Sequence, residues 1–285
     1  AVNLLEASHY PDARWMFEED AILRAGGDPV LLAEAQRHPN RSLARAPIEL
    51  MVRIVAEGRP FTEILTAQHV LANPYVARVY GVWDAPFDDP LDPAEWRPLQ
   101  VPGIPHAGIL TDPMFLNRYP TTATNRNRAR ARIVYLYFLG VDLLATQGRP
   151  LDATSPVHNP TLNDPQCTVC HAPMDPVAGA FQHFNARGSR TVLEAWHGDM
   201  LAPGFGGAIL PPAQRTESLR WLGAQIAADP RFDRAVVGWI LRGLTGEALR
   251  DAPAADATLA ERAAWATQRQ WIDRVAQEFR LNGHD

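Results

Sequence analysis

The feature that most constrains this chain is a pair of cysteines followed at once by a histidine, in the run Cys167-Thr-Val-Cys170-His171. These are the only two cysteines among 285 residues, so one motif uses both. The spacing C-x-x-C-H is the attachment signature of a c-type haem. Each thiol adds across one haem vinyl group, and the adjacent imidazole can ligate the iron. The sequence therefore predicts one covalently held haem c, anchored by Cys167 and Cys170, with His171 as the proximal iron ligand.

Other uses of a C-x-x-C pair fit the sequence less well. A thioredoxin-like redox pair needs a βαβ setting, and no strand–helix alternation surrounds the motif. A structural zinc site needs four ligands, and the chain has no second cysteine pair. A disulfide closing so short a loop would be strained and would stabilise the chain little. Zinc is the leading alternative to haem.

The ligand on the other face of the iron decides what such a haem can do. Ligation by histidine and methionine suits electron transfer, whereas an open face admits small ligands or peroxide. Met200 is the first candidate, because small cytochromes also take their distal methionine from a downstream loop. Met174 lies one helical turn after His171, on the proximal side, so we expect it to pack in the core. Five-coordinate iron, with no protein ligand on that face, stays an alternative. The lesser candidate ligands are His197, Met114, His158, His106 and His183.

Apolar residues at helical spacing, broken by prolines, predict a mainly α-helical chain. We expect an irregular helical bundle with long proline-rich loops around one covalently attached haem. Between Trp83 and Pro113 prolines interrupt any regular element. This pattern predicts an N-terminal helical lobe at 1–85, a proline-rich loop or linker at 86–120 and a haem-c-binding helical lobe at 121–285.

Single helices are expected between proline and glycine breaks. The motif should open a short helix whose continuation is kept irregular by Pro173, Pro176 and Gly179, and residues 188–212 should form a loop over the haem. The other expected helices cover residues 13–25, 29–37, 46–57, 62–69, 125–144, 214–228, 231–244 and 259–281.

A run of alternating arginines stands near the start of the helix expected at 125–144. Such a run is typical of a solvated helix face. One or two of its guanidinium groups could instead hold haem propionates, since guanidinium pairs well with carboxylate. The arginines are Arg126, Arg128, Arg130 and Arg132.

Charge and hydropathy limit the partners and the location. The net charge of −5 gives no reason to expect nucleic-acid binding. No apolar run is long enough to span a membrane, and the longest is 133–144. The sequence shows no signal peptide, yet haem is normally attached to this motif outside the cytoplasm. We therefore expect a mature or processed chain in the periplasm or on the extracellular face.

The motif and its surroundings resemble a known family. Residues 167–184, CTVCHAPMDPVAGAFQHF, resemble the pattern C-x-x-C-H-x-x-I-D-P-L-G-x-x-L-E-N-F-D. That pattern belongs to a planctomycete-type family of cytochrome c-like proteins built of domains of unknown function. The segments 60–73, 108–140 and 232–246 are similar to further blocks of the same family. The resemblance implies haem c, an extracytoplasmic location and a longer polypeptide, without an established activity; the stretch around Met200 matches none of its blocks.

These observations predict a mono-haem electron-transfer protein that works with a protein redox partner, as a subunit of a larger redox assembly. Two other functions stay open. One is an open-faced haem enzyme acting on peroxide or another small oxidant. The other is a structural or interaction protein in which the haem serves as a staple.

Overall fold

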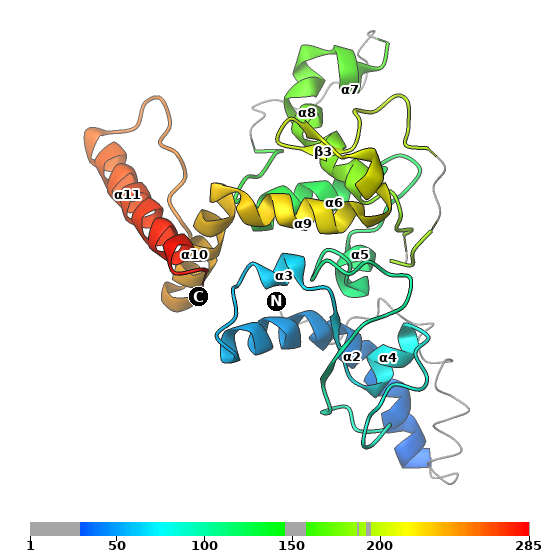
Figure 1. Ribbon diagram of the computed structural model, residues 1–285. Coiled ribbons are helices and arrows are strands. Elements are labelled where there is room, and N and C mark those ends of the chain that lie inside the picture. The colour runs from blue at the N-terminus through cyan, green and yellow to red at the C-terminus, as the bar shows by residue number, and fades with distance from the viewer. Residues whose placement is uncertain (1–28, 146–157, 187, 192–194, 285) are drawn as a thin grey trace.

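The structure, a computed structural model, describes residues 29–145, 158–186, 188–191 and 195–284 (Figure 1). The helix expected at 13–25 lies outside these residues. The protein is mainly helical, as predicted, and the described strands form two small antiparallel pairs. Within the described part of the chain, no helix combines the length and the apolar character that a membrane crossing needs.

One long helix opens the described chain. Helix α2 (Pro29–Ala56) runs through Pro39 and Pro47, so the predicted end of a first helix before Pro39 is wrong. A proline removes one backbone hydrogen bond and crowds the preceding turn, which is a local cost. Pro39 is itself buried, and the turn after it buries Leu43. Tertiary packing therefore outweighs the local cost of the proline.

Short elements follow α2. Helix α3 (Glu63–Thr66) covers only part of the helix predicted at 62–69, because the chain turns at Ala67 into strand β1 (Val70–Ala72). Strand β1 pairs antiparallel with β2 (Arg97–Leu99). The segment between Trp83 and Pro113 is otherwise irregular, as its prolines predict.

Two six-residue helices share one capping scheme. The Asn73 side chain accepts hydrogen bonds from two backbone N–H groups at the start of α4 (Pro74–Val79). Asp112 caps α5 (Pro113–Arg118) by accepting from the Met114 amide. In both helices a proline occupies the first turn, where its missing N–H costs nothing.

The helix predicted at 125–144 is shorter than expected. Arg126 and Asn127 both lie in the left-handed region, with φ of 46° and 68°, so α6 (Arg128–Ile133) begins only after them. It continues directly as a π-helical turn, η3 (Val134–Phe138). Such turns are rare and commonly lie beside functional sites.

Arg130 is fully buried in α6 and acts as a structural cross-link. Its guanidinium donates to the side chain of Asn127 and to four backbone carbonyls, those of Leu116, Tyr119, Phe184 and Asn185. The arginine run is therefore not a solvated stripe. Its central member holds the end of α5, the start of α6 and the segment after α8 together.

The second half of the chain contains the longer helices. The helices predicted at 214–228, 231–244 and 259–281 are confirmed, although the first of them opens as a 3-10 turn. The segment predicted as a loop at 188–212 contains a small hairpin, and its residues 192–194 lie outside the described part. The elements are α7 (Pro160–Asn163), α8 (Pro165–Ala180), β3 (Gly204–Phe205), β4 (Ala208–Ile209), η4 (Pro212–Glu217), α9 (Ser218–Ala228), α10 (Pro230–Thr245) and α11 (Leu259–Leu281).

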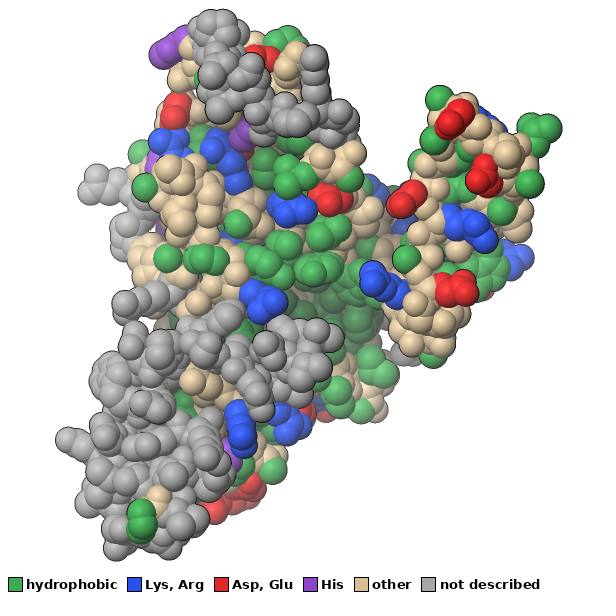
Figure 2. All heavy atoms as spheres, turned by 180° about the vertical axis from the view of Figure 1, so that it is seen from behind, with side chains coloured by type: hydrophobic (Ala, Val, Ile, Leu, Met, Phe, Trp, Pro, Cys, Tyr) green, Lys and Arg blue, Asp and Glu red, His purple; other side chains and the backbone are tan. Residues whose placement is uncertain are grey.

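The main hydrophobic core joins both halves of the chain. Ile54 and Leu65 belong to the same buried cluster as Leu222 and Ile226 of α9. Helix α9 crosses the middle of the molecule, with α3 on one side and α8 on the other (Figure 1). Helices α10 and α11 extend to one side, and the space-filling view shows this arm standing off the body (Figure 2). The predicted domain boundaries stay a prediction.

Candidate haem-attachment site

The three predicted attachment residues lie together in the first half of α8. Asp164 caps the helix through its side chain, and Pro165 fits the first turn. Cys167 and Cys170 are three positions apart, and Cys167 and His171 are four apart. Side chains at these spacings share one side of a helix. Cys167 therefore shares a helix face with Cys170 and with His171, which are neighbours along the chain.

Helix α8 continues well beyond the motif. It passes through Pro173 and Pro176 to Ala180, so the expectation of an irregular continuation is wrong. The second half of α8 buries Val177 and Ala178 in the main core. This packing keeps the chain helical where its prolines alone would favour a break.

The two cysteines are not bonded to each other. Cys170 is buried, and its Sγ donates a hydrogen bond to the Leu143 carbonyl at 2.9 Å. Cys167 is half-buried; desolvation, with Asp164 and Cys170 adding to it, raises the pKa of its thiol. A thioether has no S–H group, so bond formation at Cys170 would end its contact with Leu143.

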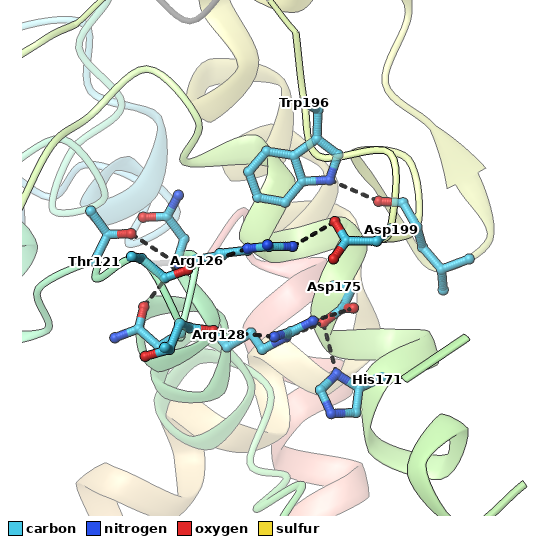
Figure 3. A network of polar contacts seen from close by, with 12 residues as sticks. Thr121, Arg126, Arg128, His171, Asp175, Trp196 and Asp199 are labelled. Carbon is cyan, nitrogen blue, oxygen red and sulfur yellow. Dashed lines mark hydrogen bonds and ion pairs between the residues drawn. The ribbon is translucent and has the colours of Figure 1, made fainter. Parts of the chain in front are cut away.

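A buried carboxylate holds His171. Asp175 lies one helical turn after His171, its side chain is fully buried, and its Oδ1 lies 3.0 Å from the imidazole Nδ1. Arg128 binds the same carboxylate with two bonds, from Nε to Oδ1 at 2.7 Å and from Nη2 to Oδ2 at 3.0 Å. In Figure 3 the three side chains form one chain of contacts, and the Nδ1 edge of the ring faces Asp175. The other ring nitrogen, Nε2, points away from the pair.

The carboxylate of this chain of contacts is ionised. Burial alone would raise the pKa of Asp175, but the hydrogen bonds from His171 and Arg128 outweigh it and lower the pKa below its usual value. An ionised carboxylate only accepts hydrogen bonds, so Nδ1 of His171 must be the donor. In the tautomer that carries its proton on Nδ1, the lone pair is on Nε2, which is the arrangement a metal-ligating histidine adopts.

A second ion pair lies next to the first. Arg126 Nη1 is 2.5 Å from Asp199 Oδ1. In the same loop, Trp196 Nε1 donates to the Leu201 carbonyl at 3.0 Å, and its ring lies 4.8 Å from that of His197. Figure 3 shows Trp196 and Asp199 on the side of Arg128 and Asp175 that faces away from His171. This ion pair anchors the loop to the start of α6 without touching His171.

Met200 is buried in the main core, with 6% of its surface exposed. It directly follows Asp199, and Pro203 of the same loop packs against Gly179 in the second half of α8. The loop therefore lies on the side to which Nδ1 of His171 points. Met200 as distal ligand stays a prediction, and Met200 would have to leave the core to reach an iron bound at Nε2.

The remaining candidate ligands have no contact with the attachment residues among the described interactions. Met174 packs in the main core, as expected. His158 is exposed, at the start of the segment that leads into α7. The buried candidates are Met114, His106 and His183.

The residues present fit a covalently attached haem. Both thiols are free, Cys167 shares a helix face with Cys170 and with His171, and the contact with Asp175 leaves Nε2 of the imidazole as the nitrogen that could ligate iron. The zinc alternative gains no ligand set, because no group of three or more His, Cys, Asp and Glu side chains that could hold a metal ion occurs in the described part of the chain. Both described sheets are antiparallel pairs, so α8 has no βαβ setting there.

Sequence reasoning missed the role of Asp175, and it considered Arg128 only as a solvated or propionate-binding residue. The signal for Asp175 was present, because a carboxylate four residues after a histidine on one helix faces that histidine. Arg128 lies 47 positions before Asp175, and only the tertiary packing of α6 on α8 brings them together. A local pattern therefore carries no sign of this contact.

Comparison with known proteins finds no matching family model, no similar curated protein and no similar solved structure. The resemblance to the planctomycete-type cytochrome c-like family therefore stays a prediction, and the function has to be argued from the geometry of the site.

Proposed function

We propose that this protein is a mono-haem c-type electron carrier that works outside the cytoplasm with a protein redox partner. One observation carries the proposal: the C-x-x-C-H residues lie within the first half of one helix, α8, and a buried carboxylate contacts Nδ1 of His171. A haem bound there would supply an iron that accepts and releases one electron. The resemblance to cytochrome c-like proteins and the absence of any other cysteine agree with this function.

The residues of the chain have separate tasks in this function. Cys167 and Cys170 would hold a haem through two thioethers, which would prevent loss of the group. His171 would ligate its iron, and Asp175 with Arg128 keeps the imidazole ring in one orientation. The protein thereby sets the electronic properties of the group and its position relative to a partner.

The test is to produce the full chain in a bacterium that attaches haem c and to examine the purified protein. We expect the denatured chain to carry the mass of one haem, and the reduced protein to show a Soret band and an α-band. The variant Cys167→Ala/Cys170→Ala should lose the covalent mass while keeping its helical circular dichroism. A chain with neither haem mass nor Soret band would overturn the proposal.

The placement of Met200 favours a second candidate, an open-faced haem that binds small ligands or peroxide. Met200 is in the core on the Nδ1 side of His171, so it would not reach the haem face opposite His171, and that face would be left to an added ligand. Rapid binding of carbon monoxide to the reduced protein, unchanged in Met200→Ala, would support this candidate. A methionine-to-iron charge-transfer band that is lost in Met200→Ala would support electron transfer with His/Met ligation.

A further inference from the structure

We infer that Arg128 and Asp175 form a positioning pair that fixes the proton of His171 on Nδ1 and sets the reduction potential of an iron bound at Nε2. The two residues are expected to shift that potential in opposite directions. This inference rests on the proposed function, and it concerns residues outside the C-x-x-C-H motif, although Asp175 falls on the aspartate of the longer pattern that residues 167–184 resemble.

Geometry supports the positioning role. Asp175 and His171 are one turn apart on the same helix, so the helical spacing places the carboxylate against the ring. The Asp175 side chain is fully buried, and the His171 side chain is 14% exposed, so water competes little for their contact. Arg128 grips both oxygens of the carboxylate and fixes its plane. A bidentate pair of this kind adds geometric specificity as well as energy.

Charge supports the effect on potential. A carboxylate that accepts the Nδ1 proton makes the ring a stronger base at Nε2, which stabilises the ferric iron and lowers the potential. The hydrogen bond is electrostatically strong because the pair is removed from water. Arg128 is a cation bound to the same oxygens, so it offsets part of the carboxylate's effect on the reduction potential. Removing Asp175 should therefore raise the potential, and removing the charge of Arg128 should lower it.

A second arginine–carboxylate pair in the chain provides a matched control. Asp199 is also a carboxylate paired with an arginine of the same run, Arg126. It is half exposed and makes no described contact with His171. The substitution Asp199→Asn removes the same charge as Asp175→Asn but leaves the support of the imidazole in place.

The experiment is a spectroelectrochemical titration of the haem-loaded full chain. We expect Asp175→Asn to change the ferric-to-ferrous equilibrium at least tenfold towards ferrous, about 59 mV for a one-electron couple. Arg128→Gln should shift it towards ferric, and Asp199→Asn should shift it less than Asp175→Asn. Shifts of equal size in Asp175→Asn and Asp199→Asn, or of the same sign in Asp175→Asn and Arg128→Gln, would overturn the inference.

A second measurement needs neither haem nor a substitution at Asp175. Nitrogen-15 NMR of the haem-free full chain, with both cysteines changed to alanine, reports which ring nitrogen of His171 carries the proton. We expect the proton on Nδ1; a proton on Nε2 contradicts the inference even if Asp175→Asn does not fold. A chain that attaches no haem overturns the proposed function alone, whereas unchanged potentials in a haem-loaded chain overturn the inference alone.

Discussion

Burial in the protein interior strongly shifts the pKa of one residue, His106. Only 2% of its surface is exposed, and its Nε2 has no hydrogen-bond partner among the described residues. Burial, followed by the charge of Arg220, lowers its pKa to about 4. In the unfolded chain the same ring titrates near 6.5. The unfolded state therefore binds the proton first, and His106 costs stability as the pH falls from 6.5 towards 4.

This shift predicts the acid sensitivity of the protein. Between pH 7 and pH 4, the wild type should lose about 3 kcal/mol more free energy of unfolding than His106→Gln. Urea unfolding at stepped pH measures the difference, and His158→Gln, at an exposed site, serves as the control. Asp112 lines the same small cavity, and burial raises its pKa to about 7. Because both proteins contain Asp112, its contribution to the pH dependence of stability cancels in the comparison. Equal losses in the wild type and His106→Gln would contradict the prediction.

The candidate site was predictable only as far as adjacent residues define it. Cys167, Cys170 and His171 follow from one pentapeptide, because haem attachment needs all three within a few ångströms of one another. Asp175 follows from helical spacing once the helix is known to continue. The pairing with Arg128 depends on two helices distant in sequence, which no local pattern reports.

At the scale of elements, local signals placed the ends of the C-terminal helices well and proline breaks badly. The bounds of α11 match the prediction because a capping box between Thr258 and Glu261 marks its start within the sequence itself. The predicted breaks at Pro39 and Pro173 do not occur. A proline in a helix costs about 3 kcal/mol locally, and the burial that offsets this cost comes from partners elsewhere in the chain.

Two helical glycines should respond oppositely to the same substitution. A Cβ on Gly179 of α8 would lie 2.7 Å from the ring of Pro203, whereas a Cβ on Gly243 of α10 meets nothing within 4 Å. Gly179→Ala should therefore destabilise the protein by about 1–3 kcal/mol through overpacking. Gly243→Ala should stabilise it by up to about 1 kcal/mol, since alanine is the better helix former. Chemical denaturation of both variants checks the pair, and a change of the same sign in both would refute it.

At the scale of the whole molecule, stability should differ between the body and the arm formed by α10 and α11. The main core runs through the body, whereas α11 packs mostly on α10 and buries few side chains (Figure 2). One nearly buried carboxylate joins the two helices: Asp233 of α10 pairs with Arg280 at 2.6 Å and with His284 at 3.1 Å. The mainly helical class followed from the sequence, but this unequal division of the core did not, because it depends on which helices meet.

The arm should therefore open before the body. Asp233→Asn should speed hydrogen exchange in α11 roughly tenfold, which corresponds to a loss of about 1.4 kcal/mol, while α9 keeps its protection. Asp273→Asn is the control, because its pair with Arg234 is more than one-third exposed and should contribute less than about 1 kcal/mol. Hydrogen exchange with mass spectrometry measures both; equal acceleration in α9 and α11 would disprove a separate opening of the arm.

The two prolines of α8 affect how its buried sulfur can be reached. Pro173 and Pro176 have no N–H to offer the carbonyls of Val169 and Ala172, so fewer backbone bonds tie the first half of α8 to the second. Each missing bond reduces the cost of local unfolding by about 1 kcal/mol. If haem is attached as proposed, the half that carries Cys170 would open for the reaction while the other half keeps its place in the core.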